Sequence, residues 1–235
     1  GTIKKYSQNL LQSSVENQAS QIEAWLNENL ASFQMAKTII EDLKPSDEEL
    51  KTILDGYYGY NSNYPEGLYV ADSTGQLITA SESTKKESDV TNSTWYKEGL
   101  SRVNMAVGSA YQNADGVNVI SASGILNDGS DKVRVISADM TLDRIAIIVN
   151  SFIEMNDAEA FLVDKTSGVI LANRDSSLIS QTLGAEGQSH FYQLTAEKAA
   201  EKDYNFATLD GNMTVFQEVD GTNWLLISYI PTSIV

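Results

Sequence analysis

The first part of the chain carries a helical pattern that nothing interrupts. Between Thr2 and Lys44 there is neither proline nor glycine, and from about Ser14 to Leu43 apolar residues recur at intervals of three and four. That spacing is typical of an amphipathic helix. At about 1.5 Å per residue the helix exceeds about 50 Å in length. The sequence therefore predicts one long helix whose apolar stripe packs against the rest of the chain.

Pro45 ends this helix, and the next residues predict a second, shorter one. Ser46 is followed three residues later by Glu49, which is the spacing of a capping box at a helix N-terminus. We expect this short helix to run through Ile53.

After Gly56 the pattern changes from helix to strand. Short apolar segments alternate with polar residues and are separated by turns rich in Asp, Asn and Gly. Successive strands with one inserted helix, around residues 95–102, predict an α+β fold rather than β-α-β alternation. The predicted strands are 67–72, 76–81, 106–111, 117–123 and 133–140.

The strand pattern repeats in the second half of the chain. Residues 68–78 match 161–171, the pair at 95–96 matches Phe191-Tyr192, and residues 135–138 match 226–229. Three matched elements in the same order predict two related modules with antiparallel sheets. We expect the two helices in 1–56, the first module in 57–143, a connecting helix in 144–157 and the second module in 158–235.

Composition excludes several functions. The chain has 32 acidic and 16 basic residues, so its net charge of −16 repels nucleic acid. One histidine and no cysteine leave little for a catalytic triad, a thiolate metal site or a thiol nucleophile. We therefore expect no enzyme activity, no cofactor and no metal site.

The two-module order, the segment Thr94-Trp95-Tyr96-Lys97-Glu98 and the ending 223–231 together resemble the double Cache (dCache) family. These are PAS-like extracytoplasmic sensor domains of chemoreceptors, histidine kinases and related receptors. The resemblance implies that the first module is membrane-distal and binds a small molecule, and that transmembrane helices flank both ends. It also implies a homodimer through the N-terminal helix.

In the amino-acid-sensing members a set of aromatic residues, a basic residue and a closing aspartate bind the ligand. Ser93 stands where those members carry the basic residue, Ser88 stands where they carry a first tyrosine, and Asn113 stands where some have a further acid. The resemblance assigns four positions to ligand contact: Trp95, Tyr96, Tyr111 and Asp139. We expect four polar residues to contact the ligand as well: Ser93, Asn113, Ser121 and Ser123.

Asp139 also stands out from its own strand. Alternation places it on the otherwise apolar face of residues 133–140, and Ser121 and Ser123 make the end of the neighbouring strand polar in the same way. A buried carboxylate needs a cation or several donors. Because Ser93 lacks the charged donors that a ligand carboxylate requires, the residues favour an amine or a nucleobase-like heterocycle over a free amino acid.

Several alternatives stay open. Asp139 and Ser93 are both suited to capping a helix. The chain is also compatible with a histidine kinase or cyclase ectodomain that senses an amino acid or small carboxylate. A structural ectodomain whose pocket is filled by its own side chains is a further alternative. A hydrolase built on paired acids is disfavoured, because the acids cluster in polar turns and on the long helix.

Overall fold

The computed structural model describes residues 1–234, and it begins with the predicted long helix. Helix α1 spans Thr2–Leu43, and α2 spans Asp47–Asp55. Between them Lys44 has a positive φ of 46° and Pro45 follows, so the chain turns sharply there. The Ser46 hydroxyl accepts from the Glu49 N–H while the Glu49 carboxylate accepts from the Ser46 N–H, which confirms the capping box.

Contacts divide the chain into two compact units, and α1 contributes to both. We call residues 27–141 the first sheet unit. The second sheet unit combines residues 1–26 with the described residues from Leu142 onward.

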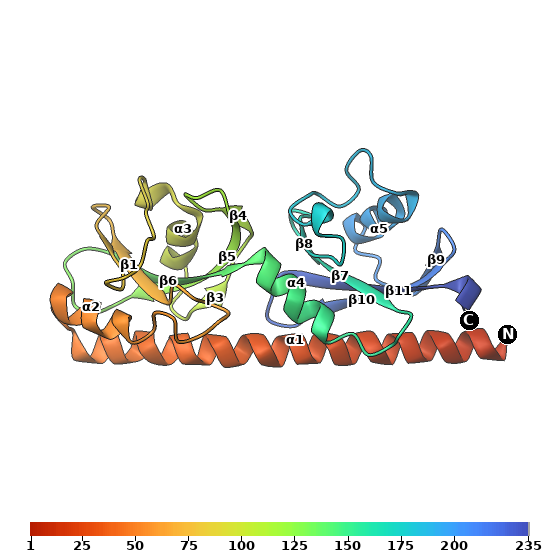
Figure 1. Ribbon diagram of the computed structural model, residues 1–235, viewed down its shortest axis with the longest axis horizontal. Coiled ribbons are helices and arrows are strands. Elements are labelled where there is room, and N and C mark those ends of the chain that lie inside the picture. The colour runs from red at the N-terminus through yellow and green to blue at the C-terminus, as the bar shows by residue number, and fades with distance from the viewer. Residues whose placement is uncertain (235) are drawn as a thin grey trace. The chain divides into compact units, whose positions relative to one another are not determined.

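The first sheet unit contains an antiparallel sheet with the order β2-β1-β6-β5-β3, and β4 also pairs with β5. Helix α3 (Thr94–Leu100) packs on β5 and β6, and the 3-10 helix η1 (Val90–Asn92) precedes it. In Figure 1, α3 lies on one side of this sheet and the C-terminal half of α1 on the other. The strands are β1 Leu68–Asp72, β2 Leu77–Ile78, β3 Ala106–Val107, β4 Tyr111–Gln112, β5 Asn118–Leu126 and β6 Arg134–Thr141.

Two predicted strands are shorter than the sequence pattern indicates. The segment 76–81 pairs only over Leu77–Ile78, and 106–111 divides into β3 and β4. The second break follows from Gly108 and Ser109, because the Glu98 carboxylate accepts from the Ser109 N–H and occupies the space that a side chain at Gly108 would need.

The second sheet unit repeats this arrangement with the order β8-β7-β11-β10-β9. Helix α4 (Leu142–Ser151) leads into it, and α5 (His190–Ala200) is the counterpart of α3. The 3-10 helices η2 (Ser176–Leu178) and η3 (Thr232–Ile234) complete it. The strands are β7 Glu159–Asp164, β8 Ile170–Ala172, β9 Ala207–Leu209, β10 Asn212–Val219 and β11 Trp224–Pro231.

The strand registers fix which residues of the two sheets are equivalent. Asp72 and Asp164 begin equivalent turns; Asp72 pairs with Arg134, and Asp164 pairs with Trp224. Counting along the paired strands, residues 134–139 correspond to 224–229, whereas the sequence match had equated 135–138 with 226–229. Both β6 and β11 are buried over five successive residues, so their apolar runs do not alternate and the sequence alone does not reveal an offset of one residue.

Candidate functional site

Asp139 lies near the end of β6 in the first sheet unit, with donors from three other segments around it. Its Oδ1 accepts hydrogen bonds from the Tyr69 hydroxyl on β1 and from Ser121 Oγ on β5, the latter at 2.7 Å. Its Oδ2 accepts from Lys85 Nζ at 3.0 Å. The Asp139 side chain is 14% exposed, so burial is offset by these donors and by the Lys85 charge.

A tyrosine extends this network across the sheet. Tyr111 on β4 and Ser121 are linked through their hydroxyls at 2.5 Å, and Ser121 in turn contacts Asp139. Burial, together with the nearby Asp139 charge, raises the pKa of Tyr111 above its ordinary value. Tyr111 is therefore neutral throughout the physiological pH range and keeps its proton for hydrogen bonding.

Trp95 forms the aromatic wall of the cluster. It is fully buried, and its ring meets the Tyr69 ring edge to face with centroids 4.8 Å apart. Its indole N–H donates to Glu87 at 3.2 Å. Trp95 is set at the start of α3, where Gly99 lets the helix approach β6; a Cβ at Gly99 would lie 2.3 Å from Val135 Cγ1.

Tyr64 adds a buried hydroxyl to the first sheet unit. It lies between α2 and β1 along the chain, and its ring packs edge-on against Phe33 with centroids 4.5 Å apart. Burial, and then the Asp139 charge, raises the pKa of Tyr64. Among the described residues its hydroxyl has no hydrogen-bond partner, although buried polar groups are normally paired.

Five of the residues predicted from sequence therefore belong to one cluster: Trp95, Tyr96, Tyr111, Ser121 and Asp139, with the Tyr96 ring edge-on to Trp95 at a centroid distance of 5.9 Å. The Tyr96 hydroxyl points elsewhere and donates to the Val133 carbonyl at 2.9 Å. The other three have contacts of their own, and Ser93 Oγ donates to the Val90 carbonyl at 2.5 Å.

Of the remaining two, Asn113 lies in the turn after β4 and Ser123 lies within β5. Asn113 Oδ1 accepts from the N–H groups of Asp115 and Val117 and closes the turn between β4 and β5. Ser123 Oγ accepts from Arg102 at 3.1 Å. The helix-capping alternative for Ser93 has no support in a side-chain bond, since its hydroxyl caps no N–H of α3.

Sequence reasoning did not single out Tyr64, Tyr69 or Lys85. Tyr69 lies in a predicted strand, but only the cross-strand pairing with Ser137, two residues before Asp139, brings it to the site. Lys85 and Tyr64 lie outside the strands and carry no periodic signal. The sequence predicted that Asp139 needs a cationic partner, but it did not identify Lys85 as that partner.

The equivalent position of the second sheet unit has different chemistry. Tyr229 occupies the register position of Asp139, and Phe161 occupies that of Tyr69. The Tyr229 ring packs against Phe161 and Phe191, with centroids 6.2 and 4.5 Å away, and its hydroxyl donates to Glu159. Aromatic side chains thus fill the place that a carboxylate occupies in the first sheet unit.

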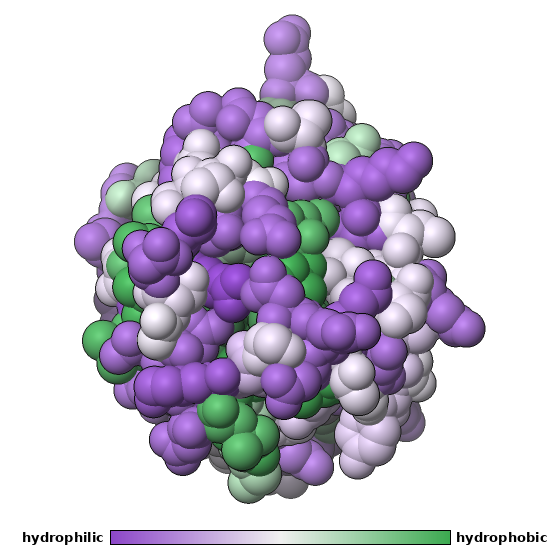
Figure 2. All heavy atoms as spheres, turned by 90° about the vertical axis from the view of Figure 1, so that its left-hand side faces the viewer, coloured by the Kyte–Doolittle hydropathy of each residue, from purple (hydrophilic) through white to green (hydrophobic). Residues whose placement is uncertain are grey.

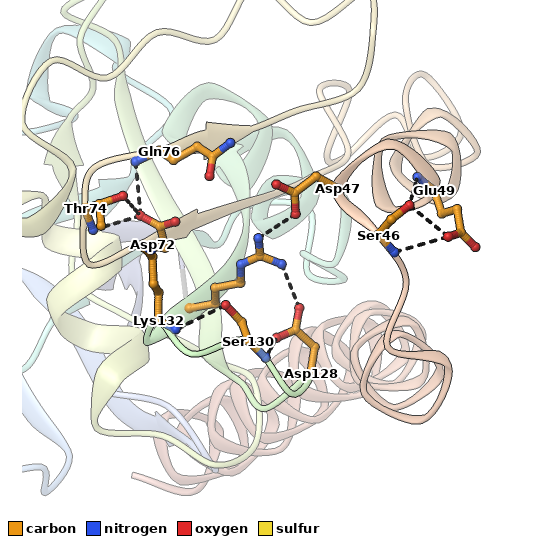
Figure 3. A network of polar contacts seen from close by, with 10 residues as sticks. Ser46, Asp47, Glu49, Asp72, Thr74, Gln76, Asp128, Ser130 and Lys132 are labelled. Carbon is orange, nitrogen blue, oxygen red and sulfur yellow. Dashed lines mark hydrogen bonds and ion pairs between the residues drawn. The ribbon is translucent and has the colours of Figure 1, made fainter.

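A second polar network of the first sheet unit is centred on Arg134. The guanidinium donates to Asp128 at 2.9 Å and to Asp47 at 2.7 Å, on two sides of the group in Figure 3. Asp72 accepts instead from Thr74 and from the Gln76 N–H, and closes the β1–β2 turn. Because these groups satisfy one another, the network indicates a structural role.

A surface cavity of about 430 Å³ lies beside this network, lined by charged residues that include Lys44, Asp131 and Lys132. Figure 2 views the end of the molecule to which α2 belongs and shows mostly hydrophilic residues there. The lining of the cavity contains neither Asp139 nor Trp95. Across residues 1–234, no group of three or more His, Asp and Glu side chains is placed to hold a metal ion.

The comparisons with known proteins agree with this architecture. The double Cache family model, described as a Cache domain, matches residues 1–235. The chain therefore belongs to the double Cache family, whose members in chemoreceptors are extracytoplasmic sensor domains. No helix in the described part of the chain is long and apolar enough to span a membrane.

Solved structures of similar fold are ligand-binding domains. The domain of the Pseudomonas fluorescens chemoreceptor CtaA in complex with L-isoleucine has a TM-score of 0.78 and 20% identity, covering 99% of this chain and 95% of that chain. The domain of Mlp24 with asparagine has a TM-score of 0.76 and 18% identity, with coverages of 100% and 97%. The domain of the Pseudomonas aeruginosa PAO1 chemoreceptor PctC in complex with GABA has a TM-score of 0.75 and 20% identity, with coverages of 96% and 99%. At these identities the likeness establishes the fold. No curated protein matches the sequence significantly.

Proposed function

We propose that this chain is the ligand-sensing extracytoplasmic domain of a transmembrane signalling receptor, and that its first sheet unit binds a small nitrogen-containing molecule through Asp139. The observation that carries the proposal is the buried carboxylate of Asp139, which accepts from Lys85 Nζ beside the rings of Tyr69 and Trp95. A buried carboxylate is costly without charged or hydrogen-bonding partners, and the cation that Asp139 pairs with here is an ammonium group. The second sheet unit has Tyr229 at the equivalent position and lacks that charge.

The chemistry of the cluster favours a ligand with N–H donors. Asp139 accepts hydrogen bonds, and Trp95, Tyr69 and Tyr111 provide aromatic surface for a cation or a flat ring. Ser93 stands where the amino-acid-sensing members carry a basic residue, and Lys85 brings a positive charge to the site from another segment. Amino acids carry the same ammonium group as an amine, so they stay in the proposed ligand class, as in the related domains in complex with L-isoleucine and asparagine.

Signalling in this proposal requires binding but no turnover. A ligand that binds one conformation of the domain more tightly than another shifts the population between them by its differential affinity. The ligand is therefore recovered unchanged, and chemical conversion of a bound ligand would contradict the proposal.

The test is a thermal-shift screen with n-butylamine, 4-aminobutyrate, L-isoleucine, adenine and butyrate, because a ligand that binds the native state raises its apparent stability. We expect at least one nitrogen-containing compound to raise the melting temperature, and Asp139→Ala to abolish that effect. Asp115→Ala is the matched control, because it removes the same charge from an exposed turn of the same unit. A shift caused by butyrate alone and unchanged in Asp139→Ala would refute the proposal.

We also propose that the domain pairs with a second copy through α1. The helix exposes apolar side chains on its outer surface, among them Ile3 at 72%, Tyr6 at 68% and Met35 at 65%. Such side chains on a charged surface favour a contact with another apolar surface. Analytical ultracentrifugation of the domain, compared with a Tyr6→Glu/Met35→Glu variant, tests this, and identical monomeric sedimentation of both proteins would contradict it.

A further inference from the structure

Residues 83–87 form an extended segment between β2 and η1, which we call the cover segment. Its side chains alternate: Thr84 and Lys86 are exposed, whereas Ser83, Lys85 and Glu87 are partly buried. The segment lies outside the helices and strands of the first sheet unit. The position of the cover segment therefore depends on the contacts of its inward side chains and not on hydrogen bonds to a neighbouring strand.

Each inward side chain of the cover segment has a polar partner. Ser83 donates to Glu66 at 2.8 Å, and Glu87 accepts from the Trp95 indole at 3.2 Å. Between them, Lys85 donates to Asp139 and its side chain is only 8% exposed. The central contact of the segment is thus a charged pair inside the candidate site.

The surroundings of the Lys85 ammonium are those that a ligand ammonium would need. Nζ lies 4.2 Å from the centroid of the Tyr69 ring and 6.0 Å from that of Trp95, with the Asp139 carboxylate at hydrogen-bond distance. A cation over an aromatic face and beside a carboxylate is bound by both. The lysine side chain therefore occupies the place that suits a cation.

We infer that Lys85 is a tethered substitute for the cationic group of the ligand, which holds the Asp139 position in the free domain and leaves it when the ligand binds. The inference rests on the proposed function of this site. Oδ1 of Asp139 already accepts from Tyr69 and Ser121, so a second cation would have to approach Oδ2 beside Lys85. Two ammonium groups a few ångströms apart repel each other, so the two occupants exclude one another.

This competition couples binding to the cover segment. Because the site accepts a cation only while Lys85 is away, the apparent affinity is reduced by the fraction of domains in that state. Binding then releases the central contact of the segment, while the contacts of Ser83 and Glu87 remain. Lys85 thus lowers the affinity for cationic ligands, and its release from Asp139 transmits their binding to the cover segment.

The first experiment needs no ligand. A double-mutant cycle of Lys85→Met and Asp139→Asn in the whole domain, followed by urea unfolding, measures the coupling between the two side chains. We expect a coupling of about tenfold in the unfolding equilibrium constant, which is within the usual range for residues in direct contact. Additive effects would overturn the inference, because Lys85 would then not occupy Asp139.

The second experiment measures affinity by calorimetry, with n-butylamine and 4-aminobutyrate as cationic probes and butyrate as the anionic one. Lys85→Met removes the competitor and should tighten binding of at least one cationic probe about tenfold. Lys86→Met is the matched control, because it removes the same charge from an exposed neighbour, and it should change affinity less than about twofold.

Unchanged or weaker binding of both cationic probes by Lys85→Met overturns the inference while leaving the proposed function intact. Binding of butyrate that is lost in Lys85→Met overturns it as well, because Lys85 would then bind a ligand carboxylate rather than replace a ligand cation. If no cationic probe binds to either protein, the proposed ligand class fails, and the displacement step fails with it.

Discussion

Tyr64 and Tyr69 allow one prediction in which the same chemical change has opposite effects. Replacing either tyrosine by phenylalanine removes a single buried oxygen near Asp139. The Tyr69 hydroxyl donates to the carboxylate, whereas the Tyr64 hydroxyl has no partner among the described residues. We therefore expect Tyr69→Phe to destabilise the free domain and Tyr64→Phe to stabilise it.

The magnitudes follow from these contacts. A hydrogen bond to a charged group contributes about 1.5–3 kcal/mol, so Tyr69→Phe should lower the free energy of unfolding by about that amount. A buried hydroxyl without a partner costs about 1–3 kcal/mol, and Tyr64→Phe relieves this cost without leaving a cavity at the ring. The rings themselves are retained in both variants, so the contact between Tyr64 and Phe33 is preserved.

Urea unfolding of the two variants and the wild type, without and with a ligand found in the thermal-shift screen, measures both effects. With ligand, the advantage of Tyr64→Phe should shrink or reverse, because a bound ligand pairs with the hydroxyl. A loss of stability in Tyr64→Phe equal to that in Tyr69→Phe would refute the reasoning, since it would mean that a buried partner such as an ordered water already satisfies Tyr64.

Further predictions concern the polar groups of the first sheet unit. Arg134→Met should cost about 3–5 kcal/mol of unfolding free energy, because it leaves Asp128, whose side chain is 2% exposed, without its cation. Asp47→Asn should cost at most about 1 kcal/mol, because the Asp47 side chain is 53% exposed; denaturant titrations that rank the two variants equally would contradict this. Burial and the Asp139 charge raise the pKa of Tyr111 above 10.0, so the stability it contributes is complete below pH 10.0 and is lost as the pH rises further. Tyr111→Phe should flatten the decline of the melting temperature above that pH, and an unchanged decline would refute the assignment.

Local sequence signals predicted the helices and turns because the responsible contacts are local. The absence of glycine and proline before Lys44, and the spacing of Ser46 and Glu49, act within a few residues, and both structures formed as expected. The strand over 106–111 failed for the opposite reason. It is broken where Ser109 donates to Glu98, a contact with the preceding helix that no alternation reveals.

The candidate site was predictable only in part. Asp139 interrupts an apolar face within its own strand, so its burial and its need for donors followed from alternation. The donors come from distant parts of the chain: Tyr69 is 70 residues away and Lys85 is 54 residues away. Tyr96 adjoins Trp95 in sequence, but its hydroxyl contacts Val133, because successive side chains on a helix point in different directions.

The sequence by itself determined the long helix, the order of two related sheet modules and an acidic residue in a place that should be apolar. Each of these depends on periodicity or on turn chemistry within a short stretch of chain. The tertiary structure alone decided that Lys85 pairs with Asp139, that the Tyr64 hydroxyl is buried without a partner among the described residues, and that Tyr229 takes the register position of Asp139 in the second sheet unit. These depend on register and on packing between distant segments, which carry no trace in the local pattern.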